Sequence, residues 1–194
     1  MNKKDYFRDI NFQEKRLKKG IAKITGRKKI IEAFELAREH HKNQKRDEGD
    51  PYLIHLVRVA NTLIFDLKIR KADVIVASLL HDIIEDTDIS FLEIKNRFGG
   101  KIARWVLALS RDKARETKEK KFEETIAGPK EIIIIKACDV LDNVKSLKYR
   151  KDRKERWLRH LKEAEKIYIP FVETIGNNWL TKEIKASYKY EKFN

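Results

Sequence analysis

The sequence predicts an all-α protein, folded as a helical bundle. Apolar residues recur at the spacing of a helix over most of the 194 residues, and no stretch keeps the alternation of a half-buried strand. The chain contains only 7 glycines and 3 prolines, so few positions interrupt regular structure. We therefore expect packed helices and no sheet of any size.

The expected helices are separated by short polar or glycine-containing connections. Asp50 is expected to cap one of them, with Pro51 in its first turn, and Gly99–Gly100 to end another. The Ile132–Ile135 run favours a strand locally, but the spacing after it is helical. Residues 111–128 are charged and are expected to form a mobile connection. The helices are predicted over residues 30–43, 52–67, 71–86, 91–98, 101–109, 129–147 and 152–174.

Length and composition indicate one globular domain over residues 1–194, because domains usually run to about 100–200 residues. No repeat or linker divides the chain. Cys138 is the single cysteine, which excludes an internal disulfide and fits a reducing cytoplasm. No signal-peptide pattern is present, and no run reaches the ~18 apolar residues of a membrane span, so we expect no membrane partner.

The formal net charge of +14 is concentrated in two segments. Residues 1–29 hold 11 Lys and Arg against 3 Asp and Glu, and residues 145–163 hold 9 against 3, which together give the whole excess. A basic chain attracts anions such as nucleotides or nucleic acid. Solvated faces that keep the protein soluble are the simpler interpretation, and a nucleic-acid surface is the alternative.

A group of polar residues interrupts the most apolar of the predicted helices, residues 71–86. His81 and Asp82 follow a buried-looking apolar run, and Glu85 and Asp86 lie one turn further along the same edge. Burying an imidazole beside a carboxylate is unfavourable unless both are paired. A metal ion would compensate both, whereas the structural alternative is a satisfied His–Asp pair in the core.

Two further segments supply additional candidate ligands. His55 faces inward with the apolar residues of its helix, and Asp139 interrupts the run IIIIKACDVL. Either alone is more often structural, but two His and two Asp from three apolar helices indicate a divalent site. Mixed imidazole and carboxylate ligands suit Mn, Fe, Co or Zn better than Ca, and the absence of thiolate ligands argues against structural zinc.

Glu85 and Asp86 are expected to handle a water molecule near such an ion. A carboxylate can orient the water or accept its proton, which is a chemistry that hydrolyses phosphorus esters and anhydrides. An anionic substrate also needs basic partners, for which Arg46, Lys136 and Lys145 are candidates, although each taken singly is more often surface charge.

Four sequence blocks carry a resemblance to a known family. Together with the His55…His81-Asp82…Asp139 pattern, they resemble the HD phosphohydrolase superfamily and, within it, the hydrolase domain of the RelA/SpoT enzymes. The match runs over a core of about residues 30–175, after a basic segment 1–29. No synthetase domain follows, so the chain resembles the small stand-alone alarmone hydrolases such as the metazoan SpoT homologues. The blocks are HHKNQKRDEGDPYLIHLVRVA (40–60), SLLHDIIEDTDIS (78–90), NRFGGKIARWV (96–106) and IIKACDVLDNVKSLK (134–148).

The resemblance implies an HD-domain bundle that removes pyrophosphate from the 3′ position of (p)ppGpp, giving GDP or GTP. It implies that Glu85 and Asp86 handle the water, and that Arg46 and Asn143 contact the nucleotide. The ligand set that it implies for one Mn²⁺, or another divalent transition metal, is His55, His81, Asp82 and Asp139.

The departures from the family pattern fall around the substrate. Asp47 stands where the family tends to have a basic residue, and Val140 and Asp142 stand where its DRLHN pattern has Arg and His. Leu56 replaces a usual Pro, and Ser110-Arg111 replaces a TK pair. Two alternatives therefore stay open: an HD phosphatase acting on another nucleotide, such as an adenine alarmone, NADPH or a nucleoside phosphate, and a nucleic-acid-binding regulator without turnover.

Overall fold

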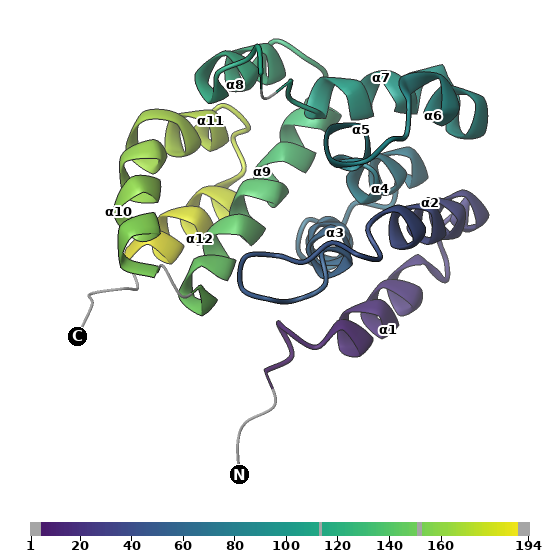
Figure 1. The fold of residues 1–194 in the computed structure, drawn as a ribbon, viewed down its shortest axis with the longest axis horizontal. Coiled ribbons are helices and arrows are strands. Elements are labelled where there is room, and N and C mark those ends of the chain that lie inside the picture. The colour runs from purple at the N-terminus through teal and green to yellow at the C-terminus, as the bar shows by residue number, and fades with distance from the viewer. Residues whose placement is uncertain (1–4, 113, 151–152, 190–194) are drawn as a thin grey trace. The chain divides into compact units, whose positions relative to one another are not determined.

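The computed structural model describes residues 5–112, 114–150 and 153–189, and these form helices (Figure 1). Within these ranges, the only strand-like pairing is one isolated antiparallel bridge between Lys45 and Pro51. The predicted all-α class is therefore confirmed. The chain divides into two compact units, Met1–Ser110 and Arg111–Asn194. The single domain over residues 1–194 stays a prediction.

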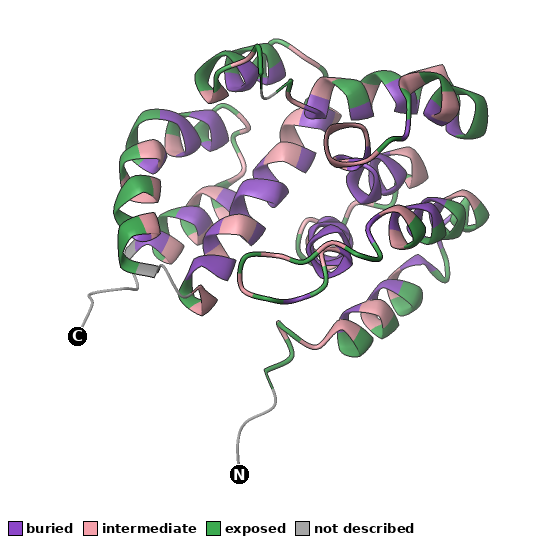
Figure 2. Ribbon diagram, viewed as in Figure 1, coloured by how far each residue is buried: buried purple, intermediate pink, exposed green. Residues whose placement is uncertain are grey.

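The first unit is built around α3 and α4, whose residues are almost all buried (Figure 2). Helix α1 packs on α3, α2 packs on α4, and α7 packs on both α4 and α6. Burial of each large aliphatic side chain stabilises the fold by about 1.5–3 kcal/mol. The helices are α1 (Ile10–Ile21), α2 (Arg27–His40), α3 (Leu53–Asn61) with a π-helical turn (Thr62–Asp66), α4 (Ala72–Leu79), α5 (Ile83–Asp86), α6 (Phe91–Phe98) and α7 (Gly100–Leu109).

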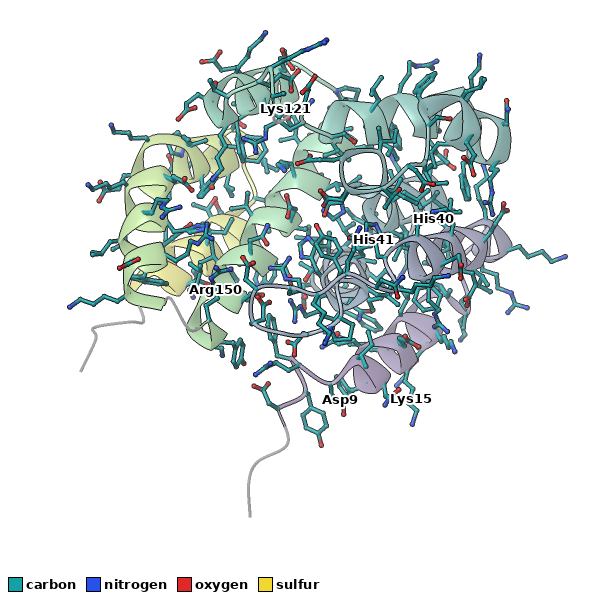
Figure 3. The ribbon with its side chains drawn as sticks, in the orientation of Figure 1. Asp9, Lys15, His40, His41, Lys121 and Arg150 are labelled. Carbon is teal, nitrogen blue, oxygen red and sulfur yellow. The ribbon has the colours of Figure 1, made fainter. Side chains whose placement is uncertain are left out.

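Helix α1 forms within the basic N-terminal segment, for which the sequence indicated no element. The Asp9 carboxylate, labelled in Figure 3, caps it by accepting a hydrogen bond from the Phe12 backbone N–H at 3.0 Å. Leu17 and Ile21 are buried, while Lys18 and Lys19 lie in the last turn, where positive charge suits the helix dipole. Residues 10–21 of this segment are therefore a packed part of the first unit.

The prediction of a single helix over residues 71–86 is wrong, because the helix is interrupted between α4 and α5. The break comprises Leu80, His81 and Asp82. The His81 ring nitrogen Nδ1 lies 2.8 Å from the Ser78 carbonyl oxygen, which a backbone N–H would otherwise occupy in a continuing helix. The polar side chain thus replaces a helical hydrogen bond at the point where the functional residues occur.

The predicted cap at Asp50 is also wrong. Helix α3 begins at Leu53 and its N-cap, Tyr52, makes no side-chain capping bond. The Asp50 carboxylate instead accepts hydrogen bonds from Arg8, the nearest at 2.7 Å. A charged partner attracts the carboxylate more strongly than neutral amides do.

The second unit is organised around α9, which packs against α8 and α12. Helix α11 packs on α12, and α10 continues through a π-helical turn into α11. The helices are α8 (Lys118–Ile126), α9 (Lys130–Ser146) with a 3-10 turn (Leu147–Tyr149), α10 (Arg153–Glu163), the π-helical turn Ala164–Tyr168, α11 (Ile169–Glu173) and α12 (Asn178–Lys189).

Two predictions for this unit need correction. The mobile connection expected over residues 111–128 contains α8, which Thr117 caps and which buries Phe122 and Thr125. The regular helix expected over residues 152–174, whose first residue lies outside the described ranges, widens into the π-helical turn before Pro170. Proline has no N–H to donate and its ring crowds the preceding turn, so the regular ladder cannot continue there. Helix α12 was not predicted.

No helix within the described part of the chain combines the length and apolar character needed to cross a membrane.

Candidate functional site

Three side chains of the first unit converge on one point. His55 comes from α3, and His81 and Asp82 come from the break between α4 and α5. One ligand atom from each lies within 4.8 Å of the others. The Asp82 Oδ2 atom lies 3.1 Å from His81 Nε2 and 3.7 Å from His55 Nε2, and the two imidazoles are only 1% exposed. Three of the four residues predicted to bind metal are therefore brought together.

The hydrogen bond at His81 Nδ1 orients the imidazole in a way that suits metal binding through Nε2. The Ser78 carbonyl can only accept, so Nδ1 carries a proton and Nε2 is the ring nitrogen that faces the Asp82 carboxylate at 3.1 Å. A divalent ion would take both this nitrogen, in the neutral ring, and the carboxylate oxygen as ligands. Metal-binding histidines commonly make this type of bond from the second ring nitrogen.

Tyr52 links the predicted ligands to a predicted catalytic carboxylate. Its hydroxyl lies 2.7 Å from Asp82 Oδ2 and 3.0 Å from Asp86 Oδ2. Burial, followed by the two carboxylates, raises the pKa of Tyr52, so the phenol keeps its proton as a donor. Asp86 and Asp82 are thus held by one shared group.

His41 and Gln44 hold Tyr52 and Asp86 in place through further contacts. The His41 ring, labelled in Figure 3, stacks on Tyr52 with centroids 4.9 Å apart. Gln44 bonds His41 Nδ1 through Oε1 at 2.7 Å and donates from Nε2 to the Asp86 carbonyl, also at 2.7 Å. Burial lowers the pKa of His41, despite the Gln44 bond and the nearby carboxylates, so the ring is neutral at neutral pH.

Tyr52, Gln44 and His41 were not selected from the sequence. They flank the segment that was singled out for Arg46, so their polarity beside a predicted site was an available signal. Glu85 lies with Asp86 on the short helix α5, and both are partly exposed. Asp86 is therefore linked to the His–Asp group through Tyr52, and Glu85 is its neighbour on α5.

Arg46 lies at the side of this group. Its Nε donates to Glu48 Oε1 at 3.0 Å, and its guanidinium carbon lies 5.9 Å from the centroid of the Tyr52 ring. The Arg46 side chain is 12% exposed. The structure thus places this predicted substrate residue beside Tyr52, with its charge partly balanced by Glu48.

The other predicted residues lie on α9 in the second unit. Asp139 is 5% exposed, and its two oxygens accept from Asn143 Nδ2 at 2.6 Å and Lys136 Nζ at 2.8 Å. Lys145 is bonded to Glu183 at 2.9 Å and lies near the ring of Trp179. Asp139, Asn143 and Lys136 therefore form one cluster, while Lys145 is engaged elsewhere in the same unit.

Comparisons with known proteins identify relatives of this chain. A family model described as HD domain matches residues 33–176. The guanosine-3′,5′-bis(diphosphate) 3′-pyrophosphohydrolase of Aquifex aeolicus is 35% identical over 157 residues, 76% of this chain and 21% of that protein. The enzyme of the same name, MESH1, of Danio rerio is 35% identical over 123 residues, 61% of this chain and 68% of that protein.

A solved structure is similar as well. It is described as a metazoan ortholog of SpoT that hydrolyses ppGpp, and it matches with a TM-score of 0.71 and 26% identity over 83% of this chain and 94% of the solved one. This chain spans only about a fifth of the Aquifex relative but two thirds of the Danio one. The family model covers most of the chain, including His55, His81 and Asp82, so the chain belongs to the HD-domain family.

Proposed function

We propose that this protein is a metal-dependent hydrolase that removes the 3′-pyrophosphate of (p)ppGpp. The observation that carries the proposal is the convergence of His55, His81 and Asp82 within 4.8 Å. The names of the relatives support the choice of substrate, and the Danio relative is itself a small protein of this kind. The family match crosses both units, which supports one HD domain over residues 1–194.

The proposed metal is Mn²⁺ or a similar divalent transition metal, held by His55, His81, Asp82 and Asp139. Imidazole and carboxylate donors suit such ions. Asp139 is a suitable fourth ligand because it is a buried carboxylate inside an apolar helix and already lies among polar partners. When bound, the ion makes water more acidic and offsets phosphate charge.

Glu85 and Asp86 are proposed to orient the attacking water and accept its proton. The water oxygen forms a bond to the phosphorus attached to the ribose 3′ oxygen, and the bond between that phosphorus and the 3′ oxygen breaks. The 3′ oxygen takes up a proton, and GDP or GTP and pyrophosphate leave. The Tyr52 hydroxyl suits this role of Asp86, because it fixes one of the two carboxylate oxygens.

Arg46, Asn143, Lys136 and Lys145 are the proposed substrate contacts. Arg46 would turn from Glu48 toward a phosphate or stack on the base. Lys136 and Asn143 would exchange part of their bonding to Asp139 for bonding to phosphate or sugar. Lys145 would have to leave Glu183 to do the same. With a nucleotide substrate and one cysteine, we expect the protein to work in a reducing cytoplasm.

The test is hydrolysis of ppGpp with Mn²⁺, with nucleotide and phosphate products separated. We expect GDP and pyrophosphate in equal amounts and no orthophosphate. A chain that bound Mn²⁺ but released no pyrophosphate from ppGpp would contradict the substrate, and one that bound no metal would contradict the site.

A second candidate is an HD phosphatase for a less charged nucleotide. The Arg46–Glu48 pair favours it, because Glu48 balances positive charge that a highly anionic substrate would use, and Asp47 adds negative charge beside it. The same assay with adenine alarmones, NADPH and nucleoside monophosphates separates the two. Salt-dependent nucleic-acid binding without turnover would instead support the regulator.

A further inference from the structure

The segment from Gln44 to Tyr52 is a tight loop that presents Arg46. The Tyr52 N–H donates to the Gln44 carbonyl at 3.0 Å, and the Arg46 N–H donates to the Asp50 carbonyl at 2.8 Å. The Gly49 N–H closes the tip by donating to the Arg46 carbonyl, with Gly49 at φ +93°, a conformation that suits glycine. The orientation of Arg46 therefore depends on the backbone at Asp50.

Two acidic side chains of this loop are buried, and each faces an arginine. Glu48 is 2% exposed and pairs with Arg46 of the same loop. Asp50 is 11% exposed and pairs with Arg8 from the N-terminal segment. Arg8 Nε lies 3.1 and 2.9 Å from the two Asp50 oxygens, Nη2 lies 2.7 Å from Oδ1, and Nη2 also donates to the Glu48 carbonyl at 3.1 Å. One guanidinium thus binds two points of the loop.

Arg8 is itself held on both sides by contacts to α3. Arg58 donates to the Phe7 carbonyl at 3.3 Å and covers the Phe7 ring at 3.9 Å. Asn61 Nδ2 donates to the backbone and side-chain oxygens of Gln13 at 3.0 and 2.9 Å. The segment is anchored before and after Arg8, so the guanidinium approaches the loop from a fixed base.

We propose that Arg8 is a positioning residue that fixes the substrate loop, acting through Asp50 on Arg46. It lies outside the residues that the HD-domain model matches, so this chain uses its basic N-terminal segment to complete the loop. The inference rests on the proposed function in one respect, namely that Arg46 contacts the nucleotide.

The physical reason is the burial of Asp50. A buried carboxylate that loses its charged partner moves toward water or takes up a proton. Movement of Asp50 toward water would carry its carbonyl away from the Arg46 N–H and widen the loop. Arg46 would then bind the nucleotide from a distribution of orientations, while the His–Asp group on α3 and α4 would stay in place.

The test compares Arg8→Ala with Arg16→Ala in the full chain. Arg16 is a matched control, because it has the same exposure of about a third, lies on α1, and contacts Asp66 and Phe65 instead of the loop. Hydrogen–deuterium exchange of the amides of Arg46, Gly49 and Tyr52 reports the loop without any substrate. Steady-state kinetics on ppGpp with Mn²⁺ report KM and kcat separately.

We expect Arg8→Ala to speed exchange at these amides at least tenfold and to raise KM about tenfold, with kcat within a factor of two. Arg16→Ala should change neither, Arg8→Lys should lie between, and Arg8→Ala with Asp50→Asn should recover part of the KM because no buried charge is left unpaired. Unchanged exchange in Arg8→Ala would show that Arg8 does not fix the loop, whatever the substrate is. Faster exchange with unchanged KM, in a chain where Arg46→Ala raises KM, would overturn its link to substrate binding.

Discussion

Each unit contains a partly buried cluster of a carboxylate, an imidazole and a tyrosine. The two clusters differ because the one in the second unit also includes the ammonium of a lysine. In the first unit, the Asp82 carboxylate faces two imidazole nitrogens and the Tyr52 hydroxyl. In the second unit, the Glu163 carboxylate faces the ammonium of Lys118 at 2.9 and 3.0 Å and accepts from Tyr168 at 2.7 Å. We call these the Asp82 cluster and the Glu163 cluster.

The difference separates a binding site from a structural ion pair. Burial acts to raise the pKa of Glu163, but the hydrogen bonds from Lys118 and Tyr168 and the nearby positive charge together outweigh it, so the pKa of Glu163 is lowered. The imidazole of His160 lies beside this pair with its pKa lowered to about 4 by burial, which outweighs the opposing charge of Glu163 and is reinforced by surrounding cations. The Asp82 cluster instead brings two imidazole nitrogens and a carboxylate oxygen to a common point, a set of atoms that would suit a cation.

The largest expected effect comes from removing a ligand of the Asp82 cluster. His81→Ala should lose both bound Mn²⁺ and detectable turnover, because the ion is proposed to depend on this imidazole. In the parent chain, Mn²⁺ at one hundred times its Kd should add about 2.7 kcal/mol of stability, or roughly 5–10 °C in Tm. Lys118→Met, in the Glu163 cluster, should keep this thermal shift. Metal content and turnover in His81→Ala equal to the parent's would place the site elsewhere.

The next effect concerns the proton acceptors. Glu85→Gln with Asp86→Asn should lower kcat by ~10²–10⁴-fold, because the water loses its general base. Mn²⁺ content should stay at the parental level, since neither residue is a proposed ligand. Metal analysis by mass spectrometry and single-turnover assays measure the two quantities separately, and parental turnover in the double variant would refute the assigned role.

How far the sequence predicts this structure can be judged from α4 and α5. The apolar spacing over residues 71–86 correctly indicated helix and burial, since that pattern depends on the core that the helix faces. It could not show the break at Leu80–Asp82, because the break comes from His81 bonding the Ser78 carbonyl. A side chain that replaces a backbone hydrogen-bond donor does not change the spacing of the apolar residues, so the sequence pattern cannot reveal it.

The candidate site shows the same division between residue types and geometry. His55, His81 and Asp82 could be selected because polar residues in apolar helices require partners, and in the structure one ligand atom of each lies within 4.8 Å of the others. Tyr52 and Gln44 offered only the weaker signal of polarity beside Arg46, because their roles depend on the shape of the loop around it. The cap expected at Asp50 failed for a related reason, since Arg8 lies 42 residues away along the chain and local propensity carries no information about it.

Tyrosine variants compare the two clusters directly. Tyr52→Phe removes the hydroxyl between Asp82 and Asp86 but keeps the ring that stacks on His41, and we expect kcat to fall ~10–100-fold. Tyr168→Phe removes the matching hydroxyl on Glu163 and should leave kcat and Mn²⁺ affinity unchanged. Equal effects of the two variants on kcat would mean that neither hydroxyl has a specific role in turnover.

The ion pair of the Glu163 cluster should affect stability alone. Lys118→Met leaves Glu163 without its ammonium partner, which should cost about 1–3 kcal/mol of unfolding free energy. Adding Glu163→Gln should recover part of it, because a neutral amide tolerates burial better. Urea unfolding of the two single variants and the double variant gives the coupling, and strictly additive losses would contradict a direct interaction.

The smallest expected effect is a pH dependence set by His160. Its pKa is about 4 in the folded chain and near 6.5 when unfolded, so between these values the unfolded state binds a proton that the folded state does not. Stability from this residue is therefore complete above pH 6.5 and is lost as the pH falls toward 4, by ~1–2 kcal/mol at pH 5. Glu163 contributes in a separate window, because its pKa is lowered from 4.5 and its stabilisation is lost only below that value. His160→Gln removes the loss of stability that protonation of His160 causes above pH 4.5. It keeps the hydrogen bonds from Lys118 and Tyr168 that lower the pKa of Glu163. Urea unfolding at pH 7.5, 6 and 5, with chelator present so that metal release does not contribute, should show the parent losing more stability than the variant. Parallel losses across this range would mean that burial of His160 does not suppress its protonation.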